Sequence, residues 1–178
     1  MPRTLRKAFD QGIIDSAFKF STFVPQGLFA LMILAPRSRI TRSVMEPWWP
    51  TLTLCLCHVL IVAVSLAQPG GSAPMALFSE VFEPSGNGQL AAIMHMYTYS
   101  NFAAEEWSHV LTWDLFVGRY IWLDGLRSGV STRASVLVTN FIGPLGFLVH
   151  VALSLASGKG MPQSSLGPPS VEGDETEE

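Results

Sequence analysis

Charged residues are scarce in this sequence. Only 14% of its 178 residues are Asp, Glu, Lys or Arg, against about 25% in ordinary soluble domains. Hydrophobic residues make up 48% and the mean hydropathy is +0.33. The formal net charge of −3 excludes the strongly basic composition typical of nucleic-acid-binding proteins. A chain of this length indicates one domain, and its composition predicts that this domain is solvated by lipid.

Cysteine is scarce as well. The sequence contains two cysteines, Cys55 and Cys57, both in the apolar run LTLCLCHVLIVAVSLA. On a helix, side chains two residues apart point in different directions, so a disulfide between them is not expected. His58 beside them completes no zinc site, because the sequence lacks a second ligand pair at zinc-type spacing. The cysteines are therefore interpreted as small buried hydrophobic residues, and no metal site and no cofactor is predicted.

What the sequence does contain is four apolar windows of about the 20 residues needed to cross a bilayer. Trp48 and Trp49 begin the clearest window, where an aromatic belt would lie. Gly143-Pro144 interrupts the last window, which predicts a kink. The predicted spans are residues 13–35, 48–67, 104–123 and 134–156. The predicted fold class is all-α, an integral membrane bundle of about four transmembrane helices with a kinked last helix.

The predicted membrane domain covers residues 13–156. The segments outside the four spans differ from the spans and from one another in composition. Residues 1–12 form a basic N-terminal segment that is too short to be a transit peptide. Residues 68–103 combine turn-forming Pro, Gly and Asn with two half-apolar pieces, which predicts a loop or compact cap of interfacial helices. Residues 157–178 indicate a disordered acidic tail. With four spans, both termini and the 68–103 segment lie on one side of the membrane.

The basic residues suggest an orientation. The first connection contains Arg37, Arg39 and Arg42, the third contains Arg127 and Arg133, and the 68–103 segment contains no Lys or Arg. By the positive-inside tendency, the first and third connections face the cytoplasm or, in a plastid, the stroma. The basic residues before position 8 oppose this assignment, because four spans place them on the other side.

The third window, 104–123, carries charges at its centre. Asp114 and Arg119 lie where an unsatisfied charge costs several kcal/mol. At about 100° per residue they point about 140° apart, so each needs a partner elsewhere. They indicate either a functional site or a structural tie to the last span, and Arg119 could instead reach the interface. Gly118, one turn from Asp114, allows another helix to approach closely.

The helix of the third window also carries an aromatic stripe. It is formed by His109, Trp113, Phe116 and Tyr120 and continues to Asp124 and Arg127. Asp114 lies on a different face. The expected partners of Arg119 across the bundle are Asp15, Glu105 or a carbonyl freed by Pro144. His58 and His150 stand alone on apolar helices and are predicted to be hydrogen-bonded core histidines.

Two stretches, WSHVLTWDLFVGRYIWLDGLRSG and STRASVLVTNFIGPLGFLVH, resemble the signature of a known family. It is the neoxanthin-deficient (abscisic-acid-deficient type four) family of small plastid and cyanobacterial membrane proteins. The matching elements are His109, Asp114-Leu115-Phe116, Gly118-Arg119, Tyr120, Trp122, Asp124 and Gly143-Pro144-Leu145-Gly146. The resemblance covers residues 13–155 and is most specific around 107–147.

The resemblance implies a multi-pass protein of a plastid membrane, thylakoid or envelope, with a role in making the xanthophyll neoxanthin from violaxanthin. In this isomerisation an epoxide opens to a tertiary alcohol while a neighbouring carbon loses a proton, which yields an allene. The reaction needs an acid, a base and protection from water, and no redox cofactor. The protein would act directly, as a carotenoid isomerase, or as an accessory to that step.

For that chemistry the candidate catalytic residues are Asp114 and His109 as acid or base, with Arg119 to hold a carboxylate or stabilise an alkoxide. The candidate substrate-binding residues are Trp113, Phe116, Tyr120, Asp124 and Asn140. The bilayer and a xanthophyll are the expected partners, with another carotenoid-pathway or light-harvesting protein as a further candidate.

Two alternatives stay open. The first is a non-catalytic pigment-binding or assembly subunit of a photosynthetic membrane complex, in which the aromatic stripe only packs. The second is a small transporter or proton-conducting bundle with a water-lined path through Asp114 and Arg119, although the sequence lacks the inverted repeats common among transporters.

Overall fold

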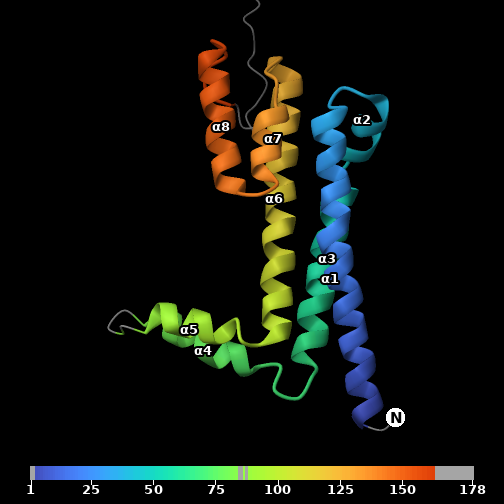
Figure 1. Ribbon diagram of the computed structural model, residues 1–178, viewed down its shortest axis with the longest axis vertical. Coiled ribbons are helices and arrows are strands. Elements are labelled where there is room, and N and C mark those ends of the chain that lie inside the picture. The colour runs from blue at the N-terminus through green and yellow to red at the C-terminus, as the bar shows by residue number, and fades with distance from the viewer. Residues whose placement is uncertain (1–2, 84–85, 87, 163–178) are drawn as a thin grey trace, which may run out of the picture.

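The computed structural model describes residues 3–83, 86 and 88–162. These residues form helices and no strand, which confirms the all-α prediction. The helices are α1 (Arg3–Leu34), α2 (Arg39–Met45), α3 (Trp49–Leu66), α4 (Ala73–Val81), α5 (Gln89–Met96), α6 (Ser100–Ser128), α7 (Arg133–Thr139) and α8 (Gly143–Ala156). Figure 1 shows α1, α3 and α6 as long rods, with α4 and α5 at one end and α2 at the other.

The first two predicted spans correspond to α1 and α3. Asp10–Leu34 within α1 and Trp49–Leu66 are long and apolar enough to cross a bilayer. No other helix among the described residues passes the same test of length and hydropathy. The four-span bundle therefore stays a prediction. The described part of the basic N-terminal segment, residues 3–12, is not separate but continues α1.

The third predicted span lies within a longer helix. α6 has 29 residues and ends at Gly129, whose φ of 77° places it in the left-handed region that glycine favours. At 1.5 Å per residue α6 is about 43 Å long. The predicted close approach at Gly118 is confirmed, because a Cβ there would lie 2.6 Å from Cε1 of Phe29 on α1.

The prediction of one kinked helix over 134–156 is wrong. The chain forms two helices, α7 and α8, separated by residues 140–142. They fold back on each other so tightly that a Cβ at Gly146 would lie 1.9 Å from the hydroxyl oxygen of Thr139. Pro144 occupies the first turn of α8, where its missing N–H is tolerated. The proline therefore starts a new helix instead of bending an existing one.

The direction of α8 changes the expected topology. Gly143 lies against Asp114, and His150 lies against Asp124, so α8 runs in the same direction as α6. α7 runs back in the opposite direction, and α8 ends at the same end of the molecule as α2, the end opposite α4 and α5 (Figure 1). The expectation that the last helix ends on the side of the 68–103 segment is therefore wrong. Of the predicted acidic tail, residues 163–178 lie outside the described residues.

The core joins α1, α2, α3, α6 and α7. Its largest member is Trp122 of α6, which is fully buried among apolar side chains that include Phe29, Met45 and Val136. The indole Nε1 of Trp122 donates a 2.8 Å hydrogen bond to the carbonyl of Pro36, just after α1. One face of α6 is thus committed to packing, which leaves the face toward α8 for other uses.

Candidate functional site

An apolar groove of about 540 Å³ lies along α6 where α8 packs against it. Its lining residues are His109, Val110, Trp113, Asp114, Phe116, Val117, Tyr120, Gly143, Pro144 and Phe147. The stripe predicted from the sequence thus lines a cavity. Asp114 was expected on a different face, but the groove is wide enough to include it.

A second cavity, the polar crevice, adjoins the groove and has a volume of about 660 Å³. It is lined by Arg42, Glu46, Trp48, Phe116, Arg119, Tyr120, Leu123, Asp124, Leu126 and Arg127. Phe116 and Tyr120 line both cavities, so the two lie next to each other along α6 and are together called the path. From His109 to Arg127 the path follows α6 for about 27 Å at 1.5 Å per residue. One end of it is apolar and the other is charged.

Asp114 lies at the start of α8. A Cβ at Gly143 would come within 2.2 Å of Oδ1 of Asp114, so glycine alone leaves room for this carboxylate. The N-terminal end of a helix carries partial positive charge, which favours a carboxylate there. As expected, the residue next to Asp114 lies on another helix and is not Arg119. Its position gives it a role in holding α8 against α6.

Arg119 holds the end of α2. Its Nε donates a 2.7 Å hydrogen bond to the carbonyl of Met45, and Nη2 donates to the carbonyl of Glu46. The guanidinium carbon lies 4.1 Å from the ring centre of Trp48. The residue is 5% exposed, so it does not extend to the surface. The expected partners Asp15, Glu105 and a carbonyl near Pro144 are wrong.

The polar crevice contains a carboxylate paired with a histidine. Oδ2 of Asp124 lies 2.9 Å from Nε2 of His150, and the histidine is fully buried in α8. The predicted hydrogen-bonded core histidine is confirmed, but its partner was missed. Residues 26 positions apart show no joint sequence signal. The pair becomes visible only when α8 is known to run parallel to α6.

Tyr120 stands between the two cavities. Its ring centre is 6.1 Å from that of Phe147, and Tyr120 lines the polar crevice together with Asp124 and Arg127. A phenol, a carboxylate and a guanidinium thus line the charged end of the path. They supply a proton donor, a proton acceptor and a positive charge, the groups that general acid–base chemistry uses.

His109 lies at the other end of the path. Nδ1 is 3.9 Å from a carboxylate oxygen of Glu106, and the ring centre lies 5.6 Å from that of His58, with the two rings tilted by 34°. His58 in turn is hydrogen-bonded to the hydroxyl of Ser108 at 2.9 Å. At 1.5 Å per residue, His109 is about 22 Å from Asp124 along α6. The two residues cannot act on the same atom of a bound ligand.

The remaining predicted binding residues separate into two groups. Trp113 and Phe116 line the groove with ring centres 5.6 Å apart, and Phe116 also stacks on Trp48. Asn140 is not among the lining residues. It lies in the turn between α7 and α8, where its amide nitrogen donates a 2.9 Å hydrogen bond to the side chain of Gln26. The structure therefore gives Asn140 a role in joining this turn to α1.

Within the described part of the chain, no group of three or more His, Cys, Asp or Glu residues could hold a metal ion.

Comparison with known proteins identifies a relative of this chain and the family to which it belongs. Protein ABA DEFICIENT 4, chloroplastic, from Arabidopsis thaliana is 28% identical over 138 residues, which is 78% of this chain and 60% of that protein. The chain thus spans less than two thirds of the length of this relative. No solved structure matches it. Residues 16–150, most of the chain, match the ABA DEFICIENT 4-like family, and this protein therefore belongs to that family.

Proposed function

We propose that this protein is a multi-pass protein of a plastid membrane that binds a xanthophyll along α6 and converts violaxanthin to neoxanthin. The observation that carries the proposal is that an apolar groove and a crevice with acid–base groups lie side by side along α6 and share Phe116 and Tyr120. The family membership and the chloroplast relative support the pathway and the compartment.

The shape and polarity of the path suit a xanthophyll. The long apolar polyene would lie between the aromatic side chains of the groove, where it avoids both water and charge. The hydroxylated epoxide ring would lie in the polar crevice beside Tyr120 and Asp124. Binding sites of this kind are mostly apolar, with a few polar groups that fix the orientation of the ligand.

The proposed chemistry uses the groups at the ring. Tyr120 donates a proton to the epoxide oxygen, the C–O bond breaks, and the oxygen becomes the tertiary alcohol. Asp124 removes a proton from the neighbouring polyene carbon, whose electrons form the allene. Transfer of that proton from Asp124 to the nearby phenolate restores both groups, so the reaction needs no other reactant. His150 positions Asp124, and Arg127 stabilises the phenolate.

In the membrane we propose three crossings by α1, α3 and α6, with α7 and α8 as a hairpin that enters and leaves on the side of α2. The 14 residues of α8 extend for about 21 Å, too short for a bilayer core of about 30 Å. A helical hairpin that ends within the bilayer is tolerated where protein covers its turn. Here one hydrogen bond, from Asn140 to Gln26 of α1, joins the turn to the rest of the protein.

A second candidate function is that of a xanthophyll-binding accessory protein. Its support is the structural use of Asp114 and Arg119, which hold α8 and α2 and leave fewer groups for catalysis. In this case the same path binds the pigment and presents it to another protein of the pathway.

The test is pigment analysis in a host that accumulates violaxanthin. Wild-type protein should produce an allenic pigment, and Asp124→Asn and Tyr120→Phe should abolish it while folded protein persists. The matched control is Glu106→Gln, which removes a carboxylate of α6 outside both cavities. Co-purified violaxanthin without a new pigment would support the accessory function. If the protein neither binds a pigment nor forms a product, both functions are refuted.

A further inference from the structure

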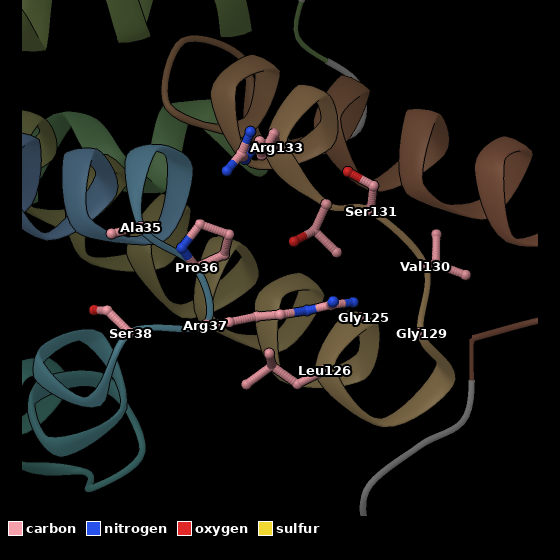
Figure 2. Close-up of a pocket in the computed structure, with 11 residues that line it drawn as sticks. Ala35, Pro36, Arg37, Ser38, Gly125, Leu126, Gly129, Val130, Ser131 and Arg133 are labelled. Carbon is pink, nitrogen blue, oxygen red and sulfur yellow. The ribbon is translucent and has the colours of Figure 1, made fainter.

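A third cavity, separate from the pigment path, lies between the α1–α2 turn and the α6–α7 turn and has a volume of about 450 Å³. Figure 2 shows Arg37 extending from the first turn across the cavity toward the second. Arg133 lies on the wall formed by the start of α7, next to Ser131 and Thr132. Two guanidiniums and several hydroxyls thus gather in a cavity that the proposed chemistry does not use.

Within the part of the chain that the structure describes, the two arginines of this cavity have no protein partner. Among the described residues, neither Arg37 nor Arg133 makes a hydrogen bond or an ion pair, whereas Arg42 pairs with Glu46 at 3.9 Å. Asp124, the nearby buried carboxylate, is engaged by His150. Positive charge at this cavity is therefore not neutralised by the described part of the protein.

The walls of the cavity are held in place. The carbonyl of Pro36 accepts a hydrogen bond from Trp122 at 2.8 Å, and that of Ala35 accepts one from the hydroxyl of Thr41 at 2.7 Å. On the other wall a Cβ at Gly125 would lie 2.1 Å from Cγ2 of Thr132. Because the backbone is fixed on both sides, an anion could bind without the cost of ordering the turns.

We propose that this cavity binds a phosphate group, and that an anionic phospholipid supplies it. Guanidiniums match phosphate oxygens in geometry and charge. The cavity lies at the end of the bundle where α1 and α6 terminate, which is the headgroup level if these helices cross a bilayer as proposed. Leu126 and Val130 also line it, which gives the start of an acyl chain an apolar surface to contact. Basic residues at this level attract anionic lipids.

The test uses the purified full-length chain in a neutral detergent. Thermal unfolding is followed while phosphatidylglycerol, phosphatidylcholine or inorganic phosphate is added, since a ligand of the folded state raises the unfolding temperature. The test variant is Arg37→Gln with Arg133→Gln. The matched control is Arg39→Gln with Lys159→Gln, which removes two charges near the same end but outside the cavity.

Phosphatidylglycerol should stabilise the wild type and the control, and the test variant should need a concentration higher by roughly tenfold or more. Phosphatidylcholine should have little effect. Stabilisation by inorganic phosphate alone with the same arginine dependence would retain the phosphate site and overturn the lipid as its source. Equal responses of all three proteins would overturn the site. If the double variant does not fold, the two single variants replace it. Pigment production by the test variant is measured separately, so failure of this site does not affect the proposed function.

Discussion

Replacing Arg119 by lysine should loosen the joint between α2 and α6. The guanidinium donates to the carbonyls of Met45 and Glu46 and lies over the ring of Trp48. Lysine keeps the positive charge but has a single ammonium group in place of the planar fork. One carbonyl at the end of α2 would then lose its donor in a place that water hardly reaches, since Arg119 is 5% exposed.

The expected cost follows from these contacts. A hydrogen bond with a charged donor contributes about 1.5–3 kcal/mol when buried, and lysine retains one of the two. The contact with the Trp48 ring contributes about 0.5–1 kcal/mol, part of which lysine also retains. The free energy of unfolding should therefore fall by about 2–4 kcal/mol. For a chain of this size that corresponds to an unfolding temperature lower by roughly 5–15 °C.

The assay is thermal unfolding of Arg119→Lys in detergent, followed by tryptophan fluorescence. Arg127→Lys is the control, because Arg127 lines the same crevice and is exposed. Pigment production per folded molecule should be retained in Arg119→Lys if this residue only holds α2. An unfolding temperature equal to that of the wild type would show that the two-carbonyl contact does not stabilise the fold, and the reasoning from geometry would be refuted.

Two further predictions concern the α7–α8 hairpin. Gly146→Ala should lower the free energy of unfolding by about 1–3 kcal/mol or more. The reason is that its Cβ would lie 1.9 Å from Oγ1 and 2.5 Å from the backbone nitrogen of Thr139. The control in the same unfolding assay is Gly27→Ala, which should not destabilise the protein because a Cβ there would have nothing within 4 Å. In a background without the native cysteines, single cysteines at Ser72 and Ser157 should be labelled from opposite sides of the membrane, and labelling from one side would refute three crossings plus a hairpin.

The long apolar helices could be predicted from the sequence because their signal is local. α1 and α3 contain long, predominantly apolar runs, and each run determines its own helix through backbone hydrogen bonds that a bilayer requires. The close approach at Gly118 was also predictable, since a missing side chain on a helix face leaves room whichever helix fills it.

The α7–α8 hairpin could not be predicted with the same reasoning. Gly-Pro within an apolar run fits both a kink in one helix and the first turn of a new helix. What decides between them is the packing of Gly146 on Thr139 and of Gly143 on Asp114, which are contacts between segments distant in the sequence. The error in helix direction then hid the pairing of Asp124 with His150.

The charges of α6 are explained by the short helices around it. Asp114 meets the positive start of α8, Arg119 meets the negative end of α2, and Asp124 meets His150 inside α8. The ends of a helix carry unpaired backbone groups, and inside a membrane water cannot satisfy them. A long helix can therefore hold a short helix in place by supplying a side chain of opposite charge to the end of the short helix. Of the three, Asp124 alone combines such a contact with the acid–base neighbours of the polar crevice. The position of α8, and with it the width of the groove, therefore depends on the same row of charges that reaches the proposed reacting ring.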